Sequence, residues 1–360
     1  EGLRIQKILE CVSSSLNEEQ RLAVQRMLSQ TLSKEHALLI FGPPGTGKTL
    51  TLVEGILAAL CDGGPATRIL CCAPSDSAAD VLVQRLTARA KTWHLEGNTT
   101  AYTPWVADNA WMLRLNPYVR DVESVRTEVV PFSAPLDDRS GRFQVPSLHK
   151  LRCIPVVVTT CATSMLLQQR GMQIGHFDLI VIDEAAQALE PETLIPLALK
   201  GGDTRVILAG DWKQLGPVVR SRAADSLGLG KSLLQRLASV PLYQKMQSEY
   251  MVKLVRNYRS HEELLKLPSA LFYDNTLVAA ANSKNTHDLL GAANIIVKPS
   301  QKEQEEEAEA FQAVAQATQD EQQVKEDARE GERHGGVGDR KVEKGERDRK
   351  KERQKDRVAE

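Results

Sequence analysis

The sequence predicts an α/β fold in which helices cover both faces of a parallel sheet. Five short runs rich in Val, Ile and Leu have continuous rather than alternating apolar residues, as in strands buried on both faces of a sheet. Stretches of helical periodicity separate these runs, which favours a doubly wound arrangement. A glycine-rich loop joins the first run to the next helical stretch. The five predicted strands are Ala37–Phe41, Arg68–Ala73, Pro155–Thr160, Phe177–Ile182 and Arg205–Ala209.

Helical periodicity also precedes the first strand, over residues 3–32. Within it, Asn17 is a plausible N-cap of a second helix, with Gln20 at the third helical position. That spacing is typical of a capping box, in which each side chain bonds the other residue's backbone N–H. Helical signal returns over 226–239 and 261–272.

The composition gives no whole-chain sign of a nucleic-acid partner. The net charge of the 360 residues is −1 and aromatic residues make up 4%, so such a partner has to be argued from local sites. No apolar stretch is long enough to span a bilayer, and no signal peptide precedes the first helix. The cysteines form no CxxC pair, and we expect buried free thiols in a reducing compartment. They are Cys11, Cys61, Cys71, Cys72, Cys153 and Cys161.

Three segments are expected along the chain. Residues 1–250 form a first domain with an insertion at about 92–150, where tryptophans and prolines lack a clear period. Residues 251–283 open a second domain. In 284–360 the charge density is high, with more than half of the last sixty residues charged, so we expect a disordered or singly helical tail. The first residue is Glu1 rather than Met, as expected for a fragment of a longer protein.

The loop after the first strand matches the G-x-x-x-x-G-K-[ST] pattern in its strand–loop–helix context. Glycines let backbone N–H groups turn toward phosphates, and the following helix N-terminus adds positive partial charge. We expect Lys48 to reach the β- and γ-phosphates of ATP and the Thr49 hydroxyl to hold Mg²⁺. The alternative is a chance glycine-rich turn. The loop consists of Gly42, Pro43, Pro44, Gly45, Thr46, Gly47, Lys48 and Thr49.

Two further strands end in polar residues that would lie at the same sheet edge. Asp183 and Glu184 follow the fourth strand, where Asp183 can bind Mg²⁺ and Glu184 can activate the attacking water. Acidic residues also favour ordinary helix N-termini, which is the structural alternative. Gln214 follows the fifth strand within plausible reach of the γ-phosphate, and a simple Gly-Asp turn explains it equally well.

The segments GPPGTGKT, CAPSDSAAD, DEAAQALEPE, GDWKQLGPV and LVRNYRSH, in this order, resemble the motifs of up-frameshift-like superfamily 1 helicases. Within that branch the sequence is similar to the plant silencing-defective RNA helicase and its animal relatives of the Moloney-leukaemia-virus-resistance and Armitage type. The resemblance covers about residues 14–283. It implies a RecA-like first domain and the opening of a second.

The resemblance assigns nucleotide contacts residue by residue. Gln20 corresponds to the glutamine that reads the adenine edge, and Tyr258 to the tyrosine that stacks on adenine. Arg259 resembles an arginine finger, which stabilises γ-phosphate charge. Gln214 resembles the glutamine that senses the γ-phosphate. From the residues alone, Gln20 could equally be a capping glutamine and Tyr258 a core residue.

The resemblance also places single-stranded RNA against Pro74, Ser75, Thr159 and Thr160, at the ends of two strands. Asp76 stands where the family usually has asparagine, and its carboxylate should lower RNA affinity unless it points away. Trp212 replaces a smaller residue or proline. The later motifs of the second domain are not recognisable after about residue 283.

The resemblance implies an ATP-dependent RNA helicase that moves 5′-to-3′ in RNA silencing, with Argonaute-type partners, in the cytoplasm or ribonucleoprotein granules. The missing motifs favour a second hypothesis for this chain, a truncated module that binds ATP and RNA without unwinding. A relative directed to DNA is a third.

Overall fold

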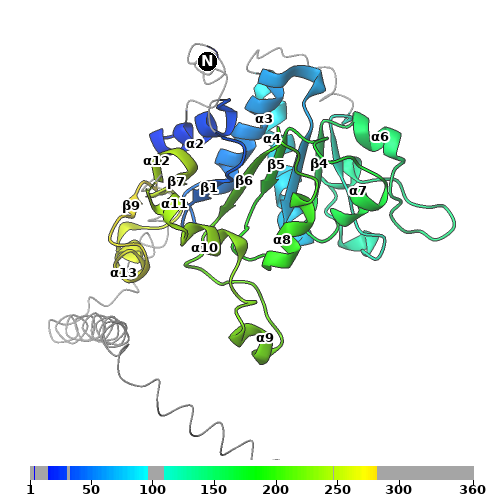
Figure 1. The fold of residues 1–360 in the computed structure, drawn as a ribbon. Helices are drawn as coiled ribbons and strands as arrows, with labels where there is room; N and C mark the ends of the chain where they lie inside the picture. Colours follow the sequence, from blue (N-terminus) through cyan, green and yellow to red (C-terminus); the bar gives the residue numbers. More distant parts are fainter. Residues whose placement is uncertain (1–3, 5–14, 31–32, 96–108, 246, 282–360) are drawn as a thin grey trace, which may run out of the picture. The chain divides into compact units, whose positions relative to one another are not determined.

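The computed structural model describes residues 4, 15–30, 33–95, 109–245 and 247–281 (Figure 1). These residues belong to the first of two compact units, Glu1–His287. The charged tail expected for 284–360 lies outside the described residues. Among the residues described, no helix has the length and apolarity needed to cross a membrane.

A seven-stranded sheet forms the centre of this unit. Every neighbouring pair in it is parallel, in the order β3-β4-β2-β5-β6-β1-β7. All five predicted strands are present, so the α/β parallel-sheet class is confirmed. The strands are β1 (Leu38–Phe41), β2 (Ile69–Ala73), β3 (Met112–Arg114), β4 (Val156–Thr160), β5 (Leu179–Ile182), β6 (Arg205–Gly210) and β7 (Met251–Lys253).

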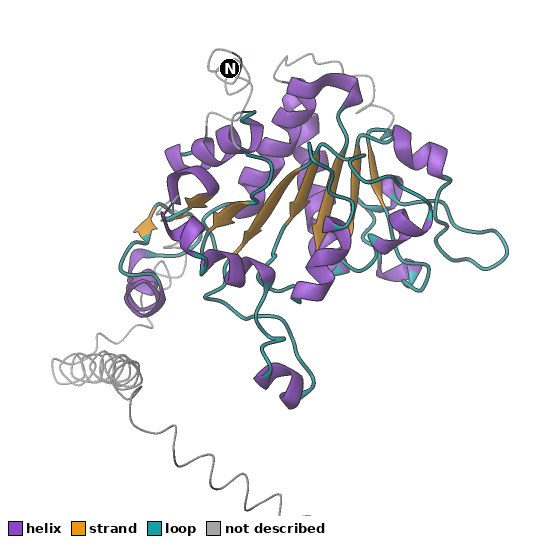
Figure 2. Cartoon of the chain, viewed as in Figure 1, coloured by secondary structure: helices purple, strands orange, loops and turns teal. Residues whose placement is uncertain are grey.

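Helices cover both faces of the sheet (Figure 2). Successive strand residues alternate between two apolar clusters: Leu38 and Ile40 face one layer of helices and Leu39 faces the other. The first layer consists of α2 (Glu18–Leu28), α3 (Lys48–Gly63) and α4 (Asp76–Leu95). The second consists of α6 (Leu148–Cys153), α7 (Met165–Gln169), α8 (Glu190–Leu197), α10 (Leu233–Ala238), α11 (Pro241–Lys245) and α12 (Gln247–Tyr250).

Nothing in the sequence predicts the two edge strands. β3 comes from the segment 92–150, so part of the expected insertion belongs to the sheet itself. β7 lies in the stretch assigned to the second domain, yet it pairs with β1. Each has only three residues and ends in a basic residue, too little for a periodicity argument. The inserted segment also holds two 3-10 turns, at Val122–Ser124 and Val130–Phe132, and a third, Gly64–Ala66, follows α3.

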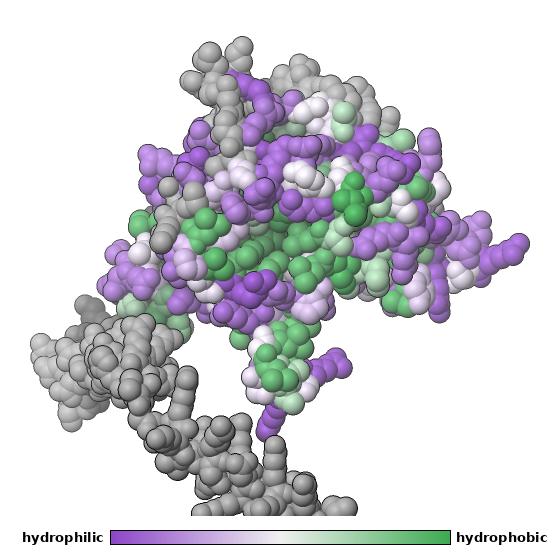
Figure 3. All heavy atoms as spheres, viewed as in Figure 1, coloured by the Kyte–Doolittle hydropathy of each residue, from purple (hydrophilic) through white to green (hydrophobic). Residues whose placement is uncertain are grey.

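The helix predicted over 226–239 is shorter than expected. Only α10 forms there, because Gly228 adopts a positive φ of 93° and interrupts the run. α9 (Arg222–Ser226) precedes it on a segment that stands away from the sheet (Figure 1). Hydrophobic atoms of this segment face solvent in Figure 3, and Leu215, Val218 and Leu227 are all more than four-fifths exposed.

A separate two-stranded parallel sheet follows β7. It pairs β8 (Arg256–Asn257) with β9 (Val278–Ala279), with α13 (Glu262–Phe272) between them. The helix predicted over 261–272 is therefore confirmed. The division of the chain into domains at 250 and 283 stays a prediction.

The thiols follow the expectation in part. Cys71, Cys72 and Cys161 are buried, and burial raises their pKa values, that of Cys161 to about 12. Cys153 is exposed, because it lies in the last turn of the short helix α6. Cys11 lies outside the described residues. Within the described part of the chain, no group of three or more His, Cys, Asp or Glu side chains could hold a metal ion.

Candidate nucleotide-binding site

The glycine-rich loop connects β1 to the first turn of α3 at the carboxyl edge of the sheet. Gly45 and Gly47 have positive φ values of 78° and 84°, a region that glycine enters without steric cost. The Lys48 ammonium is buried and donates to the Gly42 carbonyl at 2.7 Å, and the Thr46 hydroxyl donates to the Pro43 carbonyl at 2.7 Å. The loop thus holds its shape through its own side chains and presents backbone N–H groups at a helix N-terminus.

A cavity of about 460 Å³ lies beside this loop. It gathers residues from α2, α3, α4, the ends of β5 and β6, and the segment after β8, which are far apart in sequence. Arg85 on α4 is a member that the sequence did not suggest, because nothing in a mid-helix arginine distinguishes it from a solvated one. The lining residues are Gln20, Pro43, Pro44, Gly45, Gly47, Lys48, Thr49, Leu50, Arg85, Glu184, Gln214, Tyr258 and Arg259.

The Thr49 hydroxyl and the Asp183 carboxylate lie next to each other, so that both could bind one cation. The Thr49 hydroxyl donates to Asp183 Oδ2 at 3.0 Å across 134 residues of sequence. Burial raises the pKa of Asp183 to about 6, and the neighbouring Glu184 carboxylate adds to the shift. A buried carboxylate beside a hydroxyl and a second carboxylate gives hard oxygen donors, the ligands that Mg²⁺ prefers. The residues present therefore fit a magnesium ion held by Thr49 and Asp183.

Glu184 has a backbone conformation that is rare for its residue type. Its φ is 51°, in the left-handed region, which non-glycine residues enter at a cost and which is common at functional sites. This conformation turns the chain sharply after β5. The side chain lines the cavity and accepts a long hydrogen bond from Gln187 at 3.4 Å.

Gln20 has a structural role and also lies in the site. Asn17 caps α2 and forms the predicted capping box with Gln20, whose Oε1 accepts from the Asn17 backbone N–H. The Gln20 Nε2 donates to the Thr46 carbonyl at 3.0 Å, and a Cβ on Gly47 would lie 2.5 Å from it. The same amide therefore caps the N-terminus of α2 and braces the phosphate loop.

The segment after β8 contacts the loop from the other side. The Tyr258 backbone N–H donates to the Gly45 carbonyl at 2.8 Å, and its hydroxyl accepts from Asn17 Nδ2 at 2.8 Å. The ring is 44% exposed, so Tyr258 is not a core residue. Arg259 is exposed, and its Cβ lies 2.6 Å from the position that a Cβ on Gly45 would take.

Asn257, which the sequence did not single out, fastens this contact. It is buried, and its Nδ2 donates to the Pro44 carbonyl at 2.6 Å. Its Oδ1 accepts from the backbone N–H groups of Arg259 and Ser260 at 2.9 and 2.8 Å. One side chain thus binds the phosphate loop and sets the turn that carries Tyr258 and Arg259. Its partner in the loop is 213 residues away, so no local pattern could reveal the role.

Gln214 lies at the cavity rim, where its Nε2 donates to the buried Asp211 carboxylate at 2.6 Å. Trp212, a departure from the family pattern, packs against Phe41 with ring centroids 4.1 Å apart and the two rings tilted by 37°. The large ring therefore supports the end of β1, directly before the phosphate loop.

The residues predicted to hold RNA lie at the ends of the neighbouring strands β2 and β4. Ser75 is exposed and Pro74 is half-buried. Thr159 is fully buried and its hydroxyl donates to the Leu115 carbonyl at 2.9 Å, so that side chain does not face solvent. The Thr160 hydroxyl bonds that of Thr163 at 2.7 Å. The RNA contacts remain predictions, and Ser75 is the best placed of the four.

Asp76 is engaged by the inserted segment. Its carboxylate accepts from the fully buried Arg114 at 2.6 Å, and Arg114 also donates to Asp80. Arg120 completes the network on Asp80 with a bond of 2.6 Å. Burial alone would raise the pKa of Asp80, but hydrogen bonds from Arg120 and Arg114 outweigh it and hold that pKa below its usual value. The departure at Asp76 thus anchors β3 and the loop after it.

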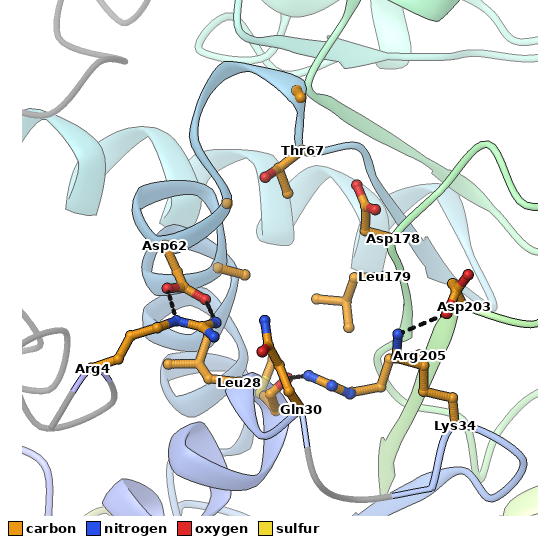
Figure 4. Close-up of a pocket in the computed structure, with 14 residues that line it drawn as sticks. Arg4, Leu28, Gln30, Lys34, Asp62, Thr67, Asp178, Leu179, Asp203 and Arg205 are labelled. Carbon is orange, nitrogen blue, oxygen red and sulfur yellow. Dashed lines mark hydrogen bonds and ion pairs between the residues drawn. The ribbon is translucent and has the colours of Figure 1, made fainter. Parts of the chain in front are cut away.

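A larger cavity, about 540 Å³, lies at the opposite edge of the sheet, where β2, β5 and β6 begin (Figure 4). Four of its charged residues form two ion pairs, Arg4 with Asp62 and Lys34 with Asp203. Asp178 accepts from the Arg68 backbone N–H, and Arg205 donates to the Met27 carbonyl. This larger cavity contains no part of the phosphate loop, so the smaller cavity is the candidate nucleotide site.

The loop, the adjoining Thr49–Asp183 pair and the parallel sheet together define a nucleotide-binding domain of the P-loop class. Comparison with known proteins extends this. Two family models, each described as an AAA domain, match residues 15–104 with 132–222, and residues 229–336. The first match covers about half of the chain and the second continues past the last described residue. The chain belongs to this family, in its up-frameshift-like helicase branch, as the motif order indicates.

Several curated relatives are helicases by name. The RNA helicase Mov10l1 of Homo sapiens is 40% identical over 296 residues, which is 79% of this chain and 22% of that protein. The putative helicase mov-10-B.1 of Danio rerio is 39% identical over 273 residues, which is 74% of this chain and 25% of that protein. The chain therefore spans about a quarter of the length of these relatives.

Two solved structures are more distant. An Arterivirus nonstructural protein 10 helicase with DNA shares 17% identity, covering 72% of this chain and 44% of that chain, with a TM-score of 0.36. Dbp5 of S. cerevisiae, in a complex that contains ADP, shares 14% sequence identity, covering 71% of this chain and 54% of that chain, with a TM-score of 0.40.

Proposed function

We propose that this chain is the ATP- and magnesium-binding part of an ATP-dependent RNA helicase. The observation that carries the proposal is the convergence of the phosphate loop, the Thr49–Asp183 pair and the Tyr258–Arg259 segment on one cavity. Relatives that bear the name RNA helicase, at about 40% identity over most of this chain, support RNA as the nucleic acid.

Each residue has a separate task in this proposal. Lys48 neutralises charge on the outer phosphates and Thr49 with Asp183 holds the cation, which when bound withdraws charge from the phosphates. Glu184 accepts a proton from the attacking water, and its strained backbone fixes where the carboxylate points. Arg259 lies on the far side of the loop, where a guanidinium stabilises negative charge as it develops on the terminal phosphate. Tyr258 offers an exposed ring on which adenine stacks, and the Gln20 amide forms hydrogen bonds to the edge of the adenine.

In this proposal, Ser75 and its neighbours at the ends of β2 and β4 bind RNA. They contact its sugar–phosphate backbone rather than its bases. Binding should therefore tolerate sequence changes and weaken as salt is raised. Movement 5′-to-3′, a role in RNA silencing, Argonaute-type partners and a place in the cytoplasm or its granules belong to the same proposal. Free buried thiols support a reducing compartment.

Calorimetry on the purified chain tests the nucleotide assignment. Lys48→Ala should abolish MgATP binding, whereas Lys34→Ala, which removes a half-buried lysine at the opposite sheet edge, should leave it unchanged. Equal nucleotide affinity in wild type and Lys48→Ala would refute the assignment of the phosphate loop as the nucleotide site. RNA-stimulated ATP turnover and strand displacement by the same preparation then separate a working motor from a module that only binds.

A further inference from the structure

A buried carboxylate lies behind Gln214. Asp211 is 2% exposed at the carboxyl end of β6 and accepts three hydrogen bonds. The donors are Gln214 Nε2 at 2.6 Å, the Tyr273 hydroxyl at 2.7 Å and the Lys213 backbone N–H at 2.9 Å. A buried carboxylate with this set of donors is held in a single orientation.

Tyr273 reaches Asp211 from a different part of the chain. It is the C-cap residue of α13, which lies between the two strands of the small sheet, and only 8% of it is exposed. Its ring lies 6.2 Å from that of Phe41, the last residue of β1. One hydroxyl therefore ties the α13 segment to the strand end from which Gln214 projects.

The chemistry of the carboxylate decides how the Gln214 amide is turned. An ionised carboxylate only accepts hydrogen bonds, so the amide must direct its NH₂ toward Asp211. Its carbonyl oxygen and its second N–H are then left for other partners. Gln214 lines the same cavity as Lys48 and Glu184, where an acceptor orients a water and a donor bonds a phosphate oxygen.

We propose that Asp211 and Tyr273 are positioning residues for Gln214, which they hold in the one amide orientation that distinguishes a nucleoside triphosphate from a diphosphate. The inference rests on the proposed function. It assigns the α13 segment a share in reading the terminal phosphate, through a side chain that does not itself touch the nucleotide.

The test measures a ratio of affinities. Calorimetry with a non-hydrolysable imido analogue of ATP and with ADP, both with Mg²⁺, gives the preference for the triphosphate. Tyr273→Phe removes one hydroxyl, and losing one hydrogen bond should reduce the ratio about threefold to tenfold. Asp211→Asn should reduce it at least as much, since an amide can no longer accept from all three donors. ADP affinity alone should hardly change, because ADP lacks the terminal phosphate.

A double-mutant cycle separates positioning from general stability. In a Gln214→Ala background, Tyr273→Phe should leave the ratio within about 1.5-fold, because the residue through which it acts is gone. Tyr250→Phe is the matched control: it removes another buried tyrosine hydroxyl, one that accepts from the Ser33 backbone N–H outside the site, and should not alter the ratio.

The outcomes are distinct. An unchanged ratio in Tyr273→Phe, or the same loss with and without Gln214, overturns the positioning role while nucleotide binding by the wild type leaves the proposed function intact. A wild-type chain that binds neither nucleotide overturns the proposed function and this inference with it.

Discussion

Replacing Asn257 by alanine should weaken both the fold and nucleotide binding. The substitution removes three hydrogen bonds: one to the Pro44 carbonyl in the phosphate loop, and two from the Arg259 and Ser260 backbone N–H groups. At about 0.5–1.5 kcal/mol for each net hydrogen bond, the free energy of unfolding should fall by about 1.5–4.5 kcal/mol. Urea unfolding measures this loss, because the shift of the midpoint at constant slope reports stability alone.

Nucleotide affinity should fall in the same variant, since the loop loses its brace and Tyr258 and Arg259 lose the turn that carries them. Asn257→Asp sharpens the test. Its carboxylate still accepts from Arg259 and Ser260, but it cannot donate to Pro44 and brings negative charge to the phosphate site. We therefore expect it to lose more nucleotide affinity than its stability loss predicts, by about tenfold for each 1.4 kcal/mol of repulsion.

Asn116→Ala is the control for this experiment. Asn116 is also fully buried, donates to the Ser133 hydroxyl and accepts from Arg120, but it lies outside the nucleotide cavity. It should lose comparable stability and bind nucleotide like the wild type below the unfolding transition. If Asn257→Ala also binds nucleotide within twofold of the wild type, Asn257 is an ordinary core residue and the reasoning fails.

The remaining predictions concern the loop glycine and the buried acid. Gly45→Ala and Gly141→Ala both place a side chain at positive φ, which costs about 1 kcal/mol. Only at Gly45 would the new Cβ lie 2.6 Å from Arg259, so thermal unfolding should show a larger loss there, and equal losses would argue against the close approach. Asp80→Asn should cost about 3 kcal/mol at neutral pH, since it removes one partner from a buried ion network. Because the pKa of Asp80 is lowered in the folded state, this contribution is present above its unfolded value of 3.8 and is lost as the pH falls through the folded value. A difference between Asp80→Asn and wild type that persisted unchanged in strong acid would contradict that account.

The parts of the fold that the sequence predicts are those with a local signal. Each of the five predicted strands has four to six residues, of which at least three in a row are apolar, and the phosphate loop is specified by adjacent residues. β3 lacks such a signal, because it is three residues long and its last residue, Arg114, is a fully buried charge. That arginine is stable in the interior only because Asp76 and Asp80 meet it from α4, a pairing that depends on the finished fold.

The same limit applies to the site. Lys48, Thr49 and Asp183 follow from motifs at strand ends, and the structure brings them together. Asn257 and Asp211 act through contacts with residues distant in sequence, which no spacing rule detects. Thr159 shows a further limit: the family resemblance assigned it an RNA contact, and only the structure reveals that its hydroxyl donates to a carbonyl 44 residues earlier.

The contact between Asn17 and Tyr258 has a consequence for biosynthesis. These two residues are 241 positions apart, and the phosphate loop that Tyr258 contacts lies between them in sequence. A ribosome releases the chain from its N-terminus, so the sheet centre and the loop emerge long before Tyr258 does. During that interval Gln20 can bond the loop, but the contacts from Asn257 and Tyr258 have not yet formed. Affinity for nucleotide should therefore arise late in synthesis, after the segment beyond β8 has left the exit tunnel.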